Sequence, residues 1–359
     1  MRLHSLLLFL LTSLLVSNCS PIGPNSVHHD RFDYNKALSD SWKEQTLLNI
    51  VRLRYADMPI FLEVASIVSG YTLEGSVNLT GNVSSENTVQ GDFLTLGTGG
   101  RFTDRPTITY APIKGDKFHK SFMTPVPPKL ILFLIESGWN PEVVLPLTVD
   151  AINGMRGRKV ASVKPKLGDQ DFYRLIRLIA EVQDSGTMAF RIIKGADSKE
   201  TIVIFFYKED VPEEINRSRE EITRLLGLNA QLDQITVTYG LLPKSDDEVA
   251  ILTRSMLQMM ITLSTAVEVP DTHLDKKMTY PIKYQPGEEE AKLGPLMRIQ
   301  GGSERPENAF VAVKHLNHWY WIDEGDFASK RTFTFLMLLF SMMESEDSEG
   351  LPLVTIPAG

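Results

Sequence analysis

The segment TIVIFFYKEDVPEEINRSREEITRLLGLNAQLDQITVTYGLL, residues 201–242, decides the fold class. Its first and last runs are rich in β-branched and aromatic residues, which predicts two strands. The middle run starts with acidic residues and then alternates apolar and charged positions, which predicts a helix with acids favourably placed in its first turn. Strands that alternate with helices indicate a sheet covered by helices, so we expect an α/β fold.

The same alternation continues on both sides of this segment. We expect helices at 169–182, 246–267 and 329–343, and strands at 188–193, 309–316 and 319–324. Asn317-His318 separates the last two strands and predicts an antiparallel hairpin in the main sheet. The expected fold class is therefore α/β (α+β), a mixed sheet with packed helices.

The N-terminal half has a different texture. Apolar residues spaced by three and four predict an amphipathic helix from Tyr34 to Ala56, and Pro59 discourages its continuation. Residues 61–71 suit a second helix or a buried strand. Residues 72–115 are dense in Gly, Asn, Ser and Thr, which favours β-hairpins or an exposed loop. A helical and β-hairpin/loop region therefore precedes the main sheet.

The first thirty residues indicate export. Residues 1–18 join a short start to a run of leucines that is too short to span a bilayer, which is typical of a signal peptide. Cys19 is the only cysteine, so no intramolecular disulfide is possible. The run that ends in Asn18-Cys19 resembles the lipobox of bacterial lipoproteins, although Asn18 replaces the usual small residue. We expect a lipid on Cys19, with an ordinary signal peptide as the alternative, and Pro and Gly in a tether over 19–30.

The net charge limits the classes of partner, and the chain length limits the number of domains. The formal net charge is −8 over 359 residues, with no basic run, which argues against nucleic acid as a partner. After the signal peptide (1–18) and the tether (19–30), we expect an N-terminal helical and β/loop region over 31–160 and an α/β C-terminal domain over 161–359.

Several short motifs together resemble a known family. They are Tyr34-Asn35, the run Val51-Arg-Leu-Arg-Tyr55 with Asp57, Pro59 and Phe61 after it, the stretch from Pro106 to Phe118, and a late Trp319-x-x-Ile-Asp323 with Ser329-Lys-Arg-Thr-Phe333. The chain resembles a group of uncharacterised bacterial lipoproteins over nearly its whole length. The resemblance implies an envelope location, and it implies no reaction. Ser20 after the cysteine is the pattern of lipoproteins sorted to the outer membrane, on its periplasmic face.

No motif identifies a reaction, a cofactor or a metal. The glycine-containing segments match neither a P-loop nor a dinucleotide fingerprint, and no nucleophile elbow or zinc-protease motif is present. His315 and His318 have no Glu or Cys at metal spacing, so we interpret them as a surface pair. We leave catalysis open and expect a non-catalytic role.

The candidate interaction residues lie in two places. Arg52 and Arg54 would close the first helix, where positive charge is favoured, and Asp57 could pair with Arg54 or help to form an anionic-ligand site. Trp319 and Trp321, with segment 72–105, are candidate recognition surfaces. We therefore expect a lipid-anchored binding or assembly component of the cell envelope that engages an envelope protein. The alternatives are a carboxylate-based envelope hydrolase and a small-ligand carrier.

Overall fold

The computed structural model describes residues 22–68, 71–82, 93–105, 107–159, 166–194, 200–207, 211–232, 234–282 and 285–344. Helices and mixed sheets alternate along it, so the α/β class predicted from the sequence is confirmed. The chain forms two compact units, each built from three separate segments. Unit 1 comprises residues 1–57, 263–281 and 295–337, and unit 2 comprises residues 58–262, 282–294 and 338–359.

A six-stranded sheet organises unit 2. Its order is β6-β5-β10-β9-β8-β7, and only the β9–β10 pair is parallel. The strands are β5 (Val149–Ile152), β6 (Met155–Arg156), β7 (Met188–Lys194), β8 (Glu200–Phe206), β9 (Gln234–Tyr239) and β10 (Glu248–Thr253). We expected a domain boundary at residue 160, but β5 and β6 lie before that position and share this sheet with strands that follow it. The sheet therefore joins the two expected domains.

Helices pack on this sheet and bury its apolar side chains. They are α4 (Pro128–Glu136), α5 (Pro141–Thr148), α6 (Gln170–Asp184) and α7 (Glu213–Leu226). Pro128 stands in the first turn of α4 and Gly138, at φ 96°, follows its end, as helix termini prefer. Unit 2 also contains α3 (Asp116–Phe118), a π-helical turn (His119–Met123) and α10 (Glu288–Leu293).

The long helix expected over residues 246–267 is wrong. The chain forms β10 there and then α8 (Met256–Ser264). Val249, Ala250 and Ile251 are buried, so this strand shows no polar alternation that would distinguish it from helix. Ser255 marks the break, because its N–H donates to Gln258 Oε1 at 2.8 Å while its Oγ accepts from the Gln258 N–H at 3.3 Å. This reciprocal pair is a capping box, which starts a new helix.

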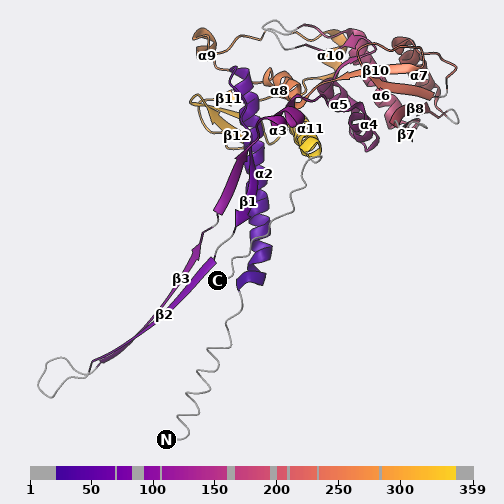
Figure 1. Cartoon of the computed structure of the whole chain (residues 1–359). Coiled ribbons are helices and arrows are strands. Elements are labelled where there is room, and N and C mark those ends of the chain that lie inside the picture. The colour runs from indigo at the N-terminus through magenta and orange to yellow at the C-terminus, as the bar shows by residue number, and fades with distance from the viewer. Residues whose placement is uncertain are drawn as a thin grey trace, which may run out of the picture. The chain divides into compact units, whose positions relative to one another are not determined.

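Two two-stranded ribbons form from the described residues between 62 and 112. β1 (Leu62–Val68) pairs with β4 (Thr107–Pro112), and β2 (Tyr71–Asn82) pairs with β3 (Phe93–Asp104), both antiparallel. Figure 1 shows β2 and β3 side by side along their length. Of the two alternatives for residues 61–71, a strand is observed over Leu62–Val68, but it is half-exposed and not buried as expected. The β-hairpin reading of residues 72–115 is likewise confirmed.

Unit 1 packs a long helix on a small sheet. α2 (Ile22–Arg54) contacts β12 (Ala309–His315), and β13 (His318–Asp323) lies between β12 and β11 (Gln300–Gly302). α9 (Asp271–Asp275) also belongs to this unit, and α11 (Phe327–Glu344) begins in it. The β12–β13 hairpin is therefore antiparallel, as expected, but it belongs to its own three-stranded sheet.

Three local expectations need correction in unit 1. Because His315 pairs with His318, the turn residues are Leu316 and Asn317, at φ 47° and 63°, one position before the expected turn. Ser329 is not the cap of α11. Its N–H and hydroxyl both donate to the Asp326 carboxylate, which caps the helix. Residues 22–30 of the expected tether belong to α2, despite Gly23 and Pro24 near its start.

Candidate functional site

The candidate residues at the end of the first helix lie in unit 1, which also contains the β12–β13 hairpin. Arg52 and Arg54 lie in the last turn of α2, as expected. Arg54 is buried, and it donates to Thr279 Oγ1 at 2.7 Å and to the Tyr280 carbonyl at 2.6 Å. The expected pair with Asp57 is therefore wrong, because the guanidinium reaches the chain after α9 instead. Cys19 and residues 1–18, where a signal peptide was expected, lie outside the described residues.

Two tyrosines and a histidine form the centre of this region. The hydroxyls of Tyr55 and Tyr320 lie 2.5 Å apart, and the Tyr55 hydroxyl lies 2.7 Å from His273 Nδ1. Tyr320 is fully buried and Tyr55 nearly so. With the His273 proton on Nε2, Tyr320 donates to Tyr55 and Tyr55 donates to Nδ1. The network ties α2, α9 and β13 together.

Two further histidines surround this network. The His315 ring lies 5.3 Å from the Tyr55 ring, and the His318 ring lies 5.3 Å from the Tyr320 ring and 6.0 Å from the His273 ring. His315 Nε2 is 3.6 Å from an Asp57 carboxylate oxygen, beyond hydrogen-bond distance. The pair that the sequence indicated on a hairpin surface is therefore half-buried, and it is joined by a third histidine that the sequence did not single out.

Burial keeps this cluster uncharged. It lowers the pKa of His273, His315 and His318, and it raises the pKa of Tyr55 and Tyr320. At neutral pH the imidazoles are neutral and the hydroxyls keep their protons. Among the residues that the structure describes, no group of three or more His, Cys, Asp or Glu side chains could hold a metal ion. Tyr55, Tyr320 and His273 are hydrogen-bonded to one another, whereas His315 and His318 contribute ring contacts and His315 Nε2 has no hydrogen-bond partner within the described chain. The role that these contacts support is to join elements of unit 1.

Trp319 and Trp321 are half-buried on β13, with Tyr320 between them. The Arg305 guanidinium lies over the Trp319 ring at 5.5 Å. The Trp321 ring packs on Gly302, where a Cβ would come within 3.1 Å of it. Both tryptophans thus have contacts inside unit 1, and they do not form an open aromatic surface.

A carboxylate-based reaction would need an acid whose pKa is raised by burial. Within the described chain, the carboxyl groups with a perturbed pKa are lowered instead. A hydrogen bond from Lys292 lowers the pKa of Glu289, and hydrogen bonds from Ser329 lower that of Asp326 against the effect of its burial. These two carboxylates suit salt links and a helix cap.

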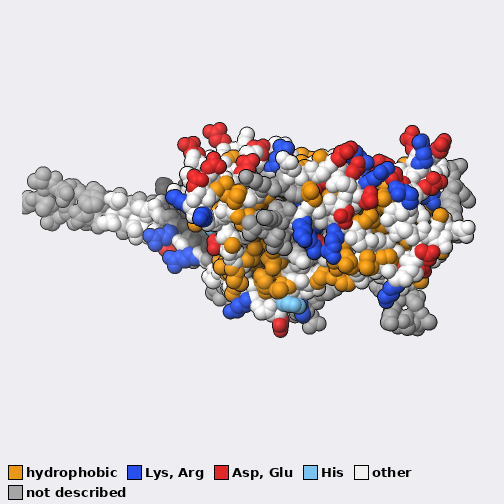
Figure 2. All heavy atoms as spheres, turned by 90° about the horizontal axis from the view of Figure 1, so that it is seen from above, with side chains coloured by type: hydrophobic (Ala, Val, Ile, Leu, Met, Phe, Trp, Pro, Cys, Tyr) orange, Lys and Arg blue, Asp and Glu red, His pale blue; other side chains and the backbone are white. Residues whose placement is uncertain are grey.

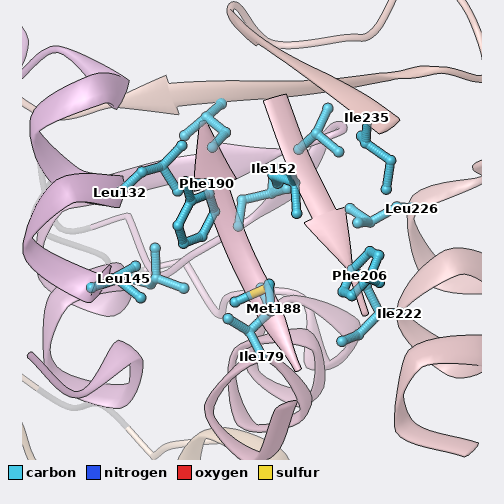
Figure 3. Close-up of a pocket in the computed structure, with 14 residues that line it drawn as sticks. Leu132, Leu145, Ile152, Ile179, Met188, Phe190, Phe206, Ile222, Leu226 and Ile235 are labelled. Atoms are coloured by element: carbon cyan, nitrogen blue, oxygen red, sulfur yellow. The ribbon is translucent and has the colours of Figure 1, made fainter. Parts of the chain in front are cut away.

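A cavity of about 50 Å³ lies between the six-stranded sheet and helices α4–α7 of unit 2 (Figure 3). Only apolar side chains line it. Those labelled in Figure 3 are Leu132, Leu145, Ile152, Ile179, Met188, Phe190, Phe206, Ile222, Leu226 and Ile235. Binding sites for small molecules usually measure about 300–1,000 Å³, so this space is a packing void too small for a carried ligand.

A polar hollow of about 170 Å³ in unit 2 brings Arg158, Lys159 and Arg254 together. Asp150 lies among them, 3.9 Å from Lys159 Nζ and 3.8 Å from Arg254 Nε. Arg254 is buried and donates to the carbonyls of Pro146, at 2.8 Å, and Arg158, at 3.0 Å. Arg254 is therefore engaged with internal carbonyl groups, and the Asp150 carboxylate offsets one of the three positive charges of the hollow.

The β2–β3 ribbon is the most open surface of the candidate segments. Its twelve residue pairs, from Tyr71↔Asp104 to Asn82↔Phe93, continue without a register shift. The side chains that the structure describes there are mostly exposed, and Val77 is 72% exposed. Within the described residues, no third strand pairs with either edge. Both edges thus present N–H and C=O groups that could pair with another strand.

Acidic and basic side chains are mixed on the surface of the protein (Figure 2). On the face shown in Figure 2, acidic and basic side chains are interspersed and no continuous basic patch forms among the coloured atoms. None of the helices in the described ranges is long and apolar enough to cross a membrane. No protein-family model, curated protein or solved structure matches the chain.

Proposed function

We propose that this chain is a non-catalytic assembly component of the bacterial cell envelope, anchored to the periplasmic face of the outer membrane by a lipid on Cys19, and that it engages its partner through the β2–β3 ribbon. The observation that carries the proposal is the ribbon itself, two strands of twelve residues with both edges unpaired in the described chain. An isolated two-stranded hairpin is marginally stable in water, so a ribbon of this length favours a bound state in which its edges are covered.

The two rival functions have less support. A carrier would need an enclosed space several times larger than the cavity under the sheet. A carboxylate hydrolase would need a buried acid with a raised pKa, and the perturbed carboxyl groups of the described residues are shifted the other way. The buried clusters of both units are engaged in internal hydrogen bonds, which suits a scaffold that presents the ribbon.

The test compares three proteins in the envelope fraction. One is the wild type, one is Cys19→Ala, and one has residues 71–104 replaced by Asn-Gly so that β1 and β4 remain joined. The proposal predicts that the wild type carries acyl mass on Cys19 and sediments, in mild detergent, as a complex larger than one chain. It predicts that Cys19→Ala loses the acyl mass and leaves the membrane fraction.

The shortened protein decides the role of the ribbon. It should remain folded, with the unfolding midpoint of the wild type, and sediment as a single chain. If the shortened protein forms the same complex as the wild type, the ribbon is not the assembly surface and this part of the proposal fails. A mature chain that starts elsewhere, without acyl mass, would overturn the anchor.

A further inference from the structure

We infer that the partner of the ribbon is a second copy of this chain, whose β3 pairs antiparallel with the free edge of β2. This inference rests on the proposed function, because it identifies the partner of the same surface. β2 and β3 are antiparallel to each other, so the free edge of β2 is matched in direction by the free edge of β3 on another copy. A copy also supplies a strand of equal length, about 40 Å for twelve residues.

Charge supports pairing between copies. Glu74 on β2 lies directly opposite Arg101 on β3, and both side chains are exposed. The acid and the base therefore stand at the same level of the ribbon, one on each edge strand. When copies pair in the register that the ribbon itself uses, Glu74 of one copy lies opposite Arg101 of the next. Opposite charges directly across strands stabilise a sheet, and like charges destabilise it.

The residue pattern supports the same register. From Tyr71 to Asn82, apolar or glycine residues alternate with polar residues. By register, the apolar positions Leu73 and Leu79 of β2 are opposite the apolar positions Phe102 and Leu96 of β3. Pairing copies in this register continues a mainly apolar set of positions, which includes Thr98 and Asp104, and a mainly polar set, which includes Phe93, whereas a slip by one residue would mix the two sets.

The ribbon also lacks most of the features that keep sheet edges from pairing. Natural edges are protected by charged side chains, above all lysine, and by proline, bulges or short length. The charged residues of β2 and β3 are Glu74, Arg101 and Asp104, and the first two are of opposite sign in the register of the ribbon. β2 and β3 contain no proline and no lysine, and their register has no bulge. The neighbouring ribbon contrasts with them, because β1–β4 has a register shift between Val64 and Ser66 and ends in Pro112. The edges of β2 and β3 are thus open to a strand over their full length.

This pairing is head to tail. Each copy offers one β2 edge and one β3 edge, so every interface is the same, and copies add until a ring closes or, if the rotation between copies does not close, into an open filament. A two-fold dimer would instead pair β2 with β2, which brings together two strands that both carry Glu74 and leaves both β3 edges free. The two arrangements make different contacts, so they can be distinguished by experiment.

The first experiment exchanges charges. Glu74→Arg and Arg101→Glu each place like charges across the interface, and each variant alone should self-associate roughly two- to thirtyfold more weakly than the wild type at low salt. Mixed in equal amounts, the two variants should recover the wild-type affinity. The arginine introduced at position 74 of one copy then faces the glutamate introduced at position 101 of the other. The charges within each ribbon stay unmatched in the mixture, so recovery reports contact between copies. Failure to recover overturns the inference.

The second experiment maps the register with disulfides. Thr80 and Thr95 lie opposite each other and are exposed, so Thr80→Cys chains mixed with Thr95→Cys chains should form mixed disulfide dimers on oxidation. Each variant alone should not, because like positions would be two strands, about 10 Å, apart. The wild type controls for Cys19, and Thr80→Cys with Thr103→Cys is the mismatched pair.

The outcomes separate this inference from the proposed function. Dimers of Thr80→Cys with itself would indicate two-fold pairing and overturn head-to-tail pairing. An assembly that depends on the ribbon but forms no disulfide between copies, or forms one with another protein, overturns the second copy as partner and leaves the proposed function standing. A wild type that remains a single chain in mild detergent overturns both.

Discussion

Removing hydroxyl groups from the Tyr55–Tyr320 pair should affect stability in a strongly non-additive way. Tyr320→Phe leaves Tyr55 bonded to His273 Nδ1, so it should cost about 1 kcal/mol, the value of one neutral hydrogen bond. Tyr55→Phe removes the acceptor of the buried Tyr320 hydroxyl and the donor to His273, and it should cost about 2–3 kcal/mol. In the double variant the stranded Tyr320 hydroxyl is gone, so it should be more stable than Tyr55→Phe alone.

Urea unfolding of the four proteins tests this order. Trp42, Trp319 and Trp321 belong to this unit and Trp139 belongs to unit 2, so tryptophan fluorescence reports mainly on this unit. The double-mutant cycle should give a coupling free energy of about 1 kcal/mol or more between the two hydroxyls. If the two single costs simply add in the double variant, the hydroxyls do not depend on each other and the proposed donor chain is refuted.

Three other perturbations have definite expected results. Arg254→Met leaves buried carbonyl groups without a donor and should lower the free energy of unfolding by about 3–5 kcal/mol in urea titrations. The exposed control Arg224→Met should change it by less than about 0.5 kcal/mol. Similar losses in both variants would contradict the structural role of Arg254. Burial lowers the pKa of the three histidines of the cluster, so the unfolded chain takes up protons first as the pH falls below about 6.5. The free energy of unfolding should be highest above that pH and should fall on acidification, by at most about 1.4 kcal/mol per pH unit for each histidine. A free energy of unfolding that stays constant from pH 7 to 5 would exclude the lowered histidine pKa values. Leu316→Gly should stabilise the β12–β13 hairpin by about 0.5–1 kcal/mol, because Leu316 has a positive φ that glycine adopts freely. The urea midpoint should therefore rise. A lower midpoint would show that the contacts of the Leu316 side chain outweigh the relief of its positive φ.

Local patterns predicted the elements well wherever one face of the element is exposed. The predicted bounds of the helix over 169–182 and of the strands over 188–193 and 201–207 agree with the observed bounds of α6, β7 and β8 to within two residues. The error over 246–267 arose where a fully buried strand runs directly into a buried helix, because both read as one apolar stretch. The signal that could have separated them, Ser255 followed three residues later by Gln258, was present in the sequence.

The tyrosine–histidine cluster could not be predicted by the same means. Tyr55 and Tyr320 are 265 residues apart, and Tyr55 and His273 are 218 apart, so no local pattern connects them. Arg54 illustrates the same limit. Its nearest acid in the sequence suggested an ion pair, whereas the folded chain offered a hydroxyl and a carbonyl from residues more than two hundred positions away. Hydrogen-bond partners that the fold brings together from distant parts of the chain cannot be predicted from the spacing of residues in the sequence.

The division of each unit into three separate segments sets the order in which the chain can mature. The buried face of α2, with Leu47, Ile50 and Val51, is covered in part by β12, which emerges from the ribosome only after most of the chain has been made. Contacts this distant in sequence slow folding and expose apolar surface in the interval. A chain with this layout therefore depends on protection from aggregation until its last third has arrived, and truncating it before residue 309 would expose the part of its first helix that β12 covers.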